Sequence, residues 1–144
     1  MDPDSRPRVL YVEDNRDLAD SAVELLRCVG FDARACYDGP TALAEASTFR
    51  PDLCLLDLNM PVMDGDELGG RLREQAGGRP LLIVAVTAMG GDEDRRRTEA
   101  AGFRLHLVKP VDPHDLLRVV DELGLILAAA ARSATAARPA GSGE

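Results

Sequence analysis

The sequence predicts a doubly wound α/β domain, in which a five-stranded parallel sheet is covered by helices on both faces. Short apolar runs alternate with helical segments along the chain, an order typical of parallel strands joined by crossover helices. The runs are apolar almost without interruption, as strands buried on both faces must be. A chain of 144 residues with 45% hydrophobic residues suffices for one domain with its own core.

The first half of the chain contains three predicted strands, which occupy residues 9–12, 31–37 and 53–56. A helix over 15–29 has apolar residues at helical spacing and stops at Gly30, a typical helix terminator. The next helix begins with Gly39-Pro40, where proline is tolerated in the first turn, and its apolar face reaches Phe49.

The second half contains strands at 81–86 and 105–108, with helices at 64–75 and 91–101 and a last helix from Asp112. Asp64 followed by Glu67 has the spacing of a capping box, and Asp112-Pro113 is typical of a helix start. We expect a flexible N-terminus over 1–7 and the folded domain over 8–127. Residues 128–144 should be an Ala-rich helix extension that becomes a disordered tail from Arg132.

The composition excludes several classes of protein. A net charge of −8 argues against a nucleic-acid partner, because phosphate contacts need clustered basic residues. No apolar segment resembles a signal peptide or a membrane span, so we predict a cytoplasmic protein without membrane contact. The three cysteines, Cys28, Cys36 and Cys54, are an odd number and favour buried thiols over a disulfide framework.

Charged and polar residues directly follow four of the predicted strands. The carboxyl ends of parallel strands meet at one edge of a sheet, where open α/β sheets bind ligands. The residues that should gather there are Glu13, Asp14, Asp57, Thr87 and Lys109.

Three carboxylates at one edge would repel each other unless a cation lies between them. Mg²⁺ prefers a few carboxylates and completes its shell with water and phosphate oxygens. A carboxylate can also act as a nucleophile toward phosphorus, with Lys109 and the cation neutralising charge. Spacing alone does not rank Asp57 above Asp14 as that nucleophile. Each residue also has an ordinary alternative: Asp57 as a strand cap, Thr87 as a turn residue, and Lys109 or Glu13 as a surface charge.

Taken together, these motifs make the sequence similar to the receiver domains of two-component response regulators. The matching segments are Glu13-Asp14, residues 57–65 (DLNMPVMDG), Val86-Thr87-Ala88 and Val108-Lys109-Pro110. Each is weak alone, but they occur in order, each after a predicted strand. The resemblance covers residues 8–127 and implies a flavodoxin-like fold with strand order 2-1-3-4-5 and five helices.

The resemblance implies a role for each site residue. Asp57 would accept a phosphoryl group from a sensor histidine kinase or a histidine phosphotransfer protein. Mg²⁺, or Mn²⁺ as a substitute, would be held by Asp14, Asp57 and the backbone carbonyl of Asn59, with Glu13 acting largely through water. Thr87 and Lys109 would hold the phosphoryl group, and the Lys109-Pro110 bond would be cis.

The sequence departs from the family at one position, three residues before Lys109. Family members usually have an aromatic residue there, whose ring moves inward together with the threonine hydroxyl on phosphorylation. His106 occupies that position, either as a plain substitute for the ring or as a pH-sensitive switch. Asn59, Ala88 and Met89 occupy positions that tune access and hydrolysis in the family, and Asn59 predicts a moderate rate of spontaneous dephosphorylation. Arg95-Arg96-Arg97 is either a solvated helix face or a contact for an acidic partner.

The expected function is a stand-alone phosphoacceptor whose phosphorylation switches contacts with an unknown protein target. It would catalyse its own phosphorylation and slow dephosphorylation rather than turn over substrates. A relay intermediate or phosphate sink is the alternative within this class, and the last helix offers a possible homodimer contact. A phosphohydrolase of the haloacid dehalogenase type is the competing class, but it needs an aspartate where this chain has Asn59. A binding module that is never phosphorylated is the third.

Overall fold

The computed structural model of the chain describes residues 6–88 and 91–137, with the side chains of Asp94 and of 134–137 outside that description. Within these residues, five strands alternate with five helices. Their bounds are β1 Arg8–Val12, α1 Arg16–Cys28, β2 Asp32–Cys36, α2 Gly39–Phe49, β3 Leu53–Asp57, α3 Gly65–Ala76, β4 Leu82–Thr87, α4 Asp92–Ala100, β5 Leu105–Val108 and α5 Pro113–Ala137. The alternation predicted from the sequence is confirmed.

The sheet has the strand order β2-β1-β3-β4-β5, and every strand pair is parallel. This is the order that the family resemblance implied. The register aligns Val12 of β1 with Leu56 of β3, and Thr87 of β4 with Val108 of β5. The residues that follow these strands therefore meet at the carboxyl edge of the sheet, as predicted.

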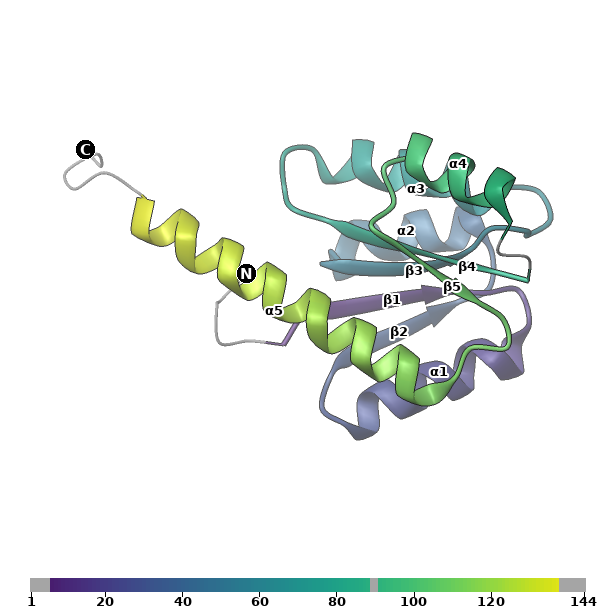
Figure 1. Cartoon of the computed structure of the whole chain (residues 1–144), viewed down its shortest axis with the longest axis horizontal. Helices are drawn as coiled ribbons and strands as arrows, with labels where there is room; N and C mark the ends of the chain where they lie inside the picture. The colour runs from purple at the N-terminus through teal and green to yellow at the C-terminus, as the bar shows by residue number, and fades with distance from the viewer. Residues whose placement is uncertain (1–5, 89–90, 138–144) are drawn as a thin grey trace.

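Helices cover both faces of the sheet, with α1 and α5 on one side and α2, α3 and α4 on the other (Figure 1). Successive side chains of a strand point to opposite faces. Leu53 and Leu55 of β3 therefore join the core beneath α1 and α5, whereas Cys54 and Leu56 join the core beneath α2 and α3. All four are fully buried, which explains why the run is apolar without interruption.

The helix starts differ in how they are capped. Asn15 accepts a hydrogen bond from the backbone of Leu18, and Asp38 accepts one from Thr41. Asp64 precedes α3 but makes no such bond, so the predicted capping box is absent. The two carboxylates of that box have other partners, because Glu67 accepts from Arg71 at 3.1 Å and Asp64 lies 4.0 Å from an Arg97 nitrogen.

At both chain ends, the described residues depart in part from the predicted boundaries. Pro7 is buried, and a Cβ placed on Gly124 of α5 would lie 3.3 Å from it, so this part of the expected flexible N-terminus packs on the domain. Helix α5 continues to Ala137, past the predicted start of the tail at Arg132, because its alanines have the highest helix propensity. It projects beyond the sheet (Figure 1). Residues 1–5 and 138–144 lie outside the described residues.

One of the three cysteines differs from the expectation that all are buried. Cys36 and Cys54 are buried, but Cys28 is exposed. The buried stripe of α1 consists of Ala19, Val23 and Leu26, and Cys28 falls off this stripe at the last residue of the helix. Among the described residues, no helix is both long and apolar enough to cross a membrane.

Candidate functional site

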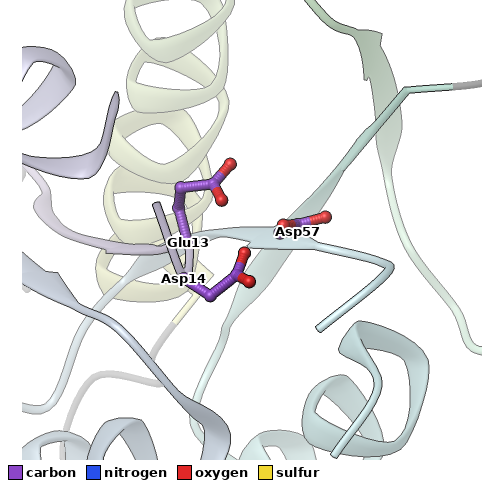
Figure 2. A group of neighbouring side chains, drawn as sticks. All are labelled: Glu13, Asp14 and Asp57. Atoms are coloured by element: carbon purple, nitrogen blue, oxygen red, sulfur yellow. The ribbon is translucent and has the colours of Figure 1, made fainter. Parts of the chain in front are cut away.

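Three carboxylates gather where β1 and β3 end, as Figure 2 shows. One oxygen from each of Glu13, Asp14 and Asp57 lies within 4.8 Å of the others. Glu13 and Asp57 are buried, with 2% and 3% of their surfaces exposed, whereas Asp14 faces solvent. Hard oxygen ligands with one open side fit a small divalent cation that keeps part of its water shell.

Lys109 reaches into this group from the loop after β5. Its ammonium lies 2.6 Å from Glu13 Oε1 and 3.1 Å from Asp57 Oδ2. The backbone of the same residue donates a 2.7 Å hydrogen bond to the carbonyl of Thr87, which ties the loop to the end of β4. The Lys109-Pro110 peptide bond is cis, as the resemblance implied.

Backbone groups fix the carboxylates in place. The amide of Asn59 donates to Asp57 Oδ1, and the amide of Asn15 donates to Glu13 Oε2, both at 3.0 Å. Gly65, at the start of α3, lies directly against the backbone of Asp57, the phosphoacceptor candidate. A Cβ atom at Gly65 would lie only 2.4 Å from the backbone oxygen of Asp57. The sequence motif contained this glycine, but only the fold reveals the close approach that requires it.

The electrostatics of the cluster follow from its burial and its partners. Burial raises the pKa of Glu13, although the bond from Lys109 opposes this shift. A hydrogen bond with Glu13 lowers the pKa of Asp14. Burial alone would lower the pKa of Lys109, but its bonds to Glu13 and Asp57 outweigh that effect and the pKa is raised. Lys109 is therefore a cation at neutral pH, and the buried carboxylates stabilise it.

Thr87 and Ala88 lie at the carboxyl end of β4, the strand that pairs with β3. Thr87 is fully buried at the end of β4, one residue beyond the partner of Asp57 in the sheet register. Ala88 is exposed, which leaves that side of the site open. Asn59 is also exposed. Met89, the third expected tuning residue, lies outside the described residues.

His106 lies on β5 and is half-buried. It lines a cavity of about 290 Å³ between α4 and β5 together with Arg95, Glu99 and Phe103. The neighbouring Leu107 packs into the core on the opposite face of the sheet. The predicted switch residue therefore points toward α4 and does not join the carboxylate cluster.

The three consecutive arginines of α4 do not form one solvated face. Arg95 and Arg96 are exposed, but Arg97 donates to Asp66 Oδ1 of α3 at 2.9 Å. This ion pair joins the two helices across the face of the domain. The alternatives predicted from the sequence did not include such an internal contact.

A second cavity, of about 400 Å³, opens beside the carboxylate cluster between α1 and the loop after β5. Glu13, Lys109 and Tyr11 are among the residues that line it. Most other lining residues are apolar, including Leu18, half of whose surface is exposed. This arrangement leaves an apolar surface directly beside Glu13 and Lys109.

Comparison with known proteins supports one family. Residues 9–121 match the response regulator receiver domain. Among curated proteins, the chain is 37% identical over 114 residues to an uncharacterized 14.6 kDa protein of Leptolyngbya boryana, covering 79% of this chain and 87% of that protein. It is 39% identical over 106 residues to the transcriptional regulatory protein PrrA of Mycobacterium leprae, covering 74% of this chain and 45% of PrrA. The chain thus spans about half the length of PrrA.

Solved structures agree with this match. The chemotaxis protein CheY4 of Vibrio cholerae superposes with a TM-score of 0.77 at 30% identity, covering 82% of this chain and 98% of CheY4. A CheY-like receiver domain protein from Methanospirillum hungatei gives a TM-score of 0.75 at 28% identity, covering 83% and 94% of the two chains. Sequence and fold therefore point to the same kind of domain.

Proposed function

Because the chain belongs to the response regulator receiver domain family of two-component signalling, we propose that Asp57 is its phosphoacceptor and that phosphorylation requires Mg²⁺. The observation that carries this proposal is the convergence on Asp57 of an ammonium at 3.1 Å and two further carboxylates. One of these, Asp14, is open to solvent and so to an incoming donor.

The donor set fits Mg²⁺, because Asp14, Asp57 and the backbone carbonyl of Asn59 offer hard oxygen ligands and Glu13 can act through a bound water. When bound, the cation would neutralise charge on the phosphoryl oxygens. Mn²⁺ has the same preference for oxygen ligands and is a possible substitute.

In the proposed reaction, a carboxylate oxygen of Asp57 attacks the phosphorus of a phosphohistidine. An O–P bond forms while the P–N bond breaks, and its electron pair stays on the leaving imidazole nitrogen, which takes a proton from water. Lys109 stabilises the negative oxygens during this transfer, and the hydroxyl of Thr87 donates to one of them. Hydrolysis later breaks the acyl phosphate, and the side chain of Asn59, which is exposed, would orient the attacking water.

The phosphodonor is proposed to be a sensor histidine kinase or a histidine phosphotransfer protein. The apolar cavity beside Lys109 supports a protein donor, because it offers contact area within reach of the reactive carboxylate. Leu18 at its margin is 51% exposed, and a partner helix that carried an apolar side chain there would cover it.

The output is proposed to be protein contact that changes when Asp57 is phosphorylated, reported by Thr87 and His106. Helix α5 supports a homodimer or partner contact, because Leu125 and Ile126 are 68% and 41% exposed on it. A relay intermediate or phosphate sink would use the same chemistry without a switch. The acidic composition favours neither nucleic acid nor an anionic membrane as the partner, and a cytoplasmic location is consistent with both roles.

Incubation with acetyl phosphate and Mg²⁺ tests the proposal. We expect one phosphoryl group per chain by intact mass, stable in acid, labile in base, and absent without the cation. Asp57→Asn should abolish it, whereas Asp64→Asn, an exposed carboxylate in the loop that follows, should not. Continuous turnover of phosphate esters would replace the proposal with a hydrolase, and a lack of any label would leave only a passive binding module.

A further inference from the structure

At the other end of the sheet, we propose that a cavity between α2 and α3 binds a small molecule with an anionic group, a phosphate or a carboxylate, on an apolar body. The cavity has a volume of about 250 Å³. Pro51 and Leu81, which line it, precede β3 and β4, whereas Asp57 and Thr87 end these strands. The six residue steps of extended chain from Pro51 to Asp57 span roughly 20 Å, so the cavity is a separate site.

The charged side chains that line this cavity are both arginines, Arg50 and Arg79, and no carboxylate is among the described lining residues. This contrasts with the net charge of −8 of the whole chain. Arg79 is held in place, because Nη1 donates to the carbonyl of Pro51 at 3.1 Å and lies 3.6 Å from Asp52 Oδ1. A guanidinium that is already positioned loses little freedom when it binds an anion.

The charges around this cavity balance one another except for the positive charge of Arg50. Helices α2 and α3 both end here, and helix C-termini attract cations. Arg8 provides the cation at the end of α2, since its guanidinium donates to the carbonyls of Phe49 and Arg50. The carboxylate of Asp52 is balanced by Arg79 and by the backbone amide of Arg8. The positive charge of Arg50 is therefore available to a ligand.

The backbone of Arg50 adds an independent observation. Its φ of 53° and ψ of 65° place it in the left-handed region, at the residue that ends α2. Glycine is the relaxed choice at such a position, and a residue with a Cβ is strained there. A strained conformation at a residue that lines a cavity and carries a long cationic side chain is a reason to look for a role of that side chain.

The rest of the lining indicates what the ligand carries besides its charge. Leu72, Leu81 and two alanines give an apolar floor, and Gln75 and Ser47 contribute polar atoms. The Gln75 amide nitrogen already donates to the carbonyl of Leu43, and the Ser47 hydroxyl donates to Ala44, so each keeps an acceptor oxygen. The volume fits one ring with an acid group better than a nucleotide.

Titration of amide NMR signals with four probes tests this proposal, in the absence of divalent cations so that the Asp57 site stays out of the measurement. Phenyl phosphate and benzoate combine a ring with an anion, benzyl alcohol lacks the anion, and inorganic phosphate lacks the ring. We expect saturable shifts at residues 46–51 and 72–81 with one or both ring anions. Their relative affinity then separates a phosphate ligand from a carboxylate ligand.

Two matched variants locate the binding charge. Arg50→Gly should weaken Kd at least about tenfold, the loss expected for a charge-assisted hydrogen bond, and should raise Tm because the backbone relaxes. Arg71→Gln removes an equal charge from the exposed face of α3 and should leave Kd unchanged. The proposal is overturned if no lining amide shifts, if inorganic phosphate or benzyl alcohol binds as tightly as the ring anions, or if both variants weaken binding equally.

Discussion

Lys109 Nζ lies 2.6 Å from Glu13 Oε1, nearer than it lies to Asp57, whose Oδ2 is 3.1 Å away. The buried glutamate is thus the closer partner of the ammonium. Lys109 is also the only lysine in the chain, which carries arginine at every other basic position. A compact ammonium fits between two carboxylates where the planar guanidinium of arginine does not.

The first prediction uses this unique lysine. Because the bonds to Glu13 and Asp57 raise the pKa of Lys109, little free amine is present at neutral pH and acylation by acetic anhydride should be slow. Asp57→Asn removes one negative partner, lowers the pKa toward its usual value and should accelerate acylation several-fold. Peptide mass spectrometry separates this product from that of the N-terminus. An equal acceleration by Asp64→Asn would contradict the assignment of the effect to this contact.

Gly65 provides a second prediction. A Cβ at this position would lie 2.4 Å from the backbone oxygen of Asp57, so Gly65→Ala must displace one backbone segment or the other. We expect a loss of about 1–3 kcal/mol in the free energy of unfolding and weaker phosphorylation by acetyl phosphate. Gly70→Ala on the same helix meets nothing within 4 Å and should instead stabilise the protein by up to about 1 kcal/mol. Urea denaturation of both variants measures the difference.

The strands, and the meeting of the residues that follow them at one edge of the sheet, could be predicted because both depend on local pattern. The run Leu53–Leu56 is apolar since both faces of β3 are covered, and parallel strands bring Glu13, Asp57 and Lys109 to one edge whatever the helices do. The burial of Glu13 was harder to predict, because a glutamate on the surface and a glutamate in a site look the same in the sequence.

What the sequence did not reveal depends on contacts between distant segments. Glu67 and Asp64 have capping-box spacing, but neighbouring arginines compete for their carboxylates. In the sequence, Arg97 is indistinguishable from its two neighbouring arginines. Only the folded structure shows that Asp66 of α3 lies beside it. The role of Gly65 likewise depends on how closely α3 crosses the end of β3. Each of these contacts is determined by tertiary packing and cannot be deduced from the local periodicity of the sequence.

A third prediction concerns alkaline pH. Burial, together with the nearby charges of Glu13 and Asp57, raises the pKa of Tyr11 from 10.0 to about 12. The protonated phenol is thus favoured in the folded state, so its contribution is complete below pH 10 and is lost as the pH rises toward 12. The loss should be on the order of 2–3 kcal/mol. Tyr11→Phe should lack this component, and parallel pH profiles for both proteins would contradict it.

The ion pair between α3 and α4 gives the opposite dependence. Burial alone would raise the pKa of Asp66, but the bonds from Arg97 outweigh it and the pKa is lowered from 3.8. The stability that it contributes is therefore present above pH 3.8 and lost as the pH falls further. Asp66→Asn should cost about 0.5–1 kcal/mol at neutral pH, since the pair is partly screened by solvent, and almost nothing in strong acid.

Glu67→Gln is the matched control for that pair. Glu67 and Arg71 form an ion pair within α3 whose side chains are 51% and 56% exposed, so its loss should cost at most about 0.5 kcal/mol. Chemical denaturation across the acid range compares the two variants. An effect of Asp66→Asn that persists undiminished at low pH would point to packing rather than charge.

The last prediction tests whether His106 makes the switch pH-sensitive. A histidine side chain changes its charge near neutral pH. Three charged residues, Glu99, Arg95 and Arg104, line the cavity together with His106. A charged imidazole is harder to bury against α4, so phosphorylation of Asp57 should shift the amide signals of α4 more at pH 8 than at pH 6. The His106→Tyr variant should respond equally at both pH values. An equal response of the unaltered protein would show that His106 is only a substitute for the usual aromatic ring.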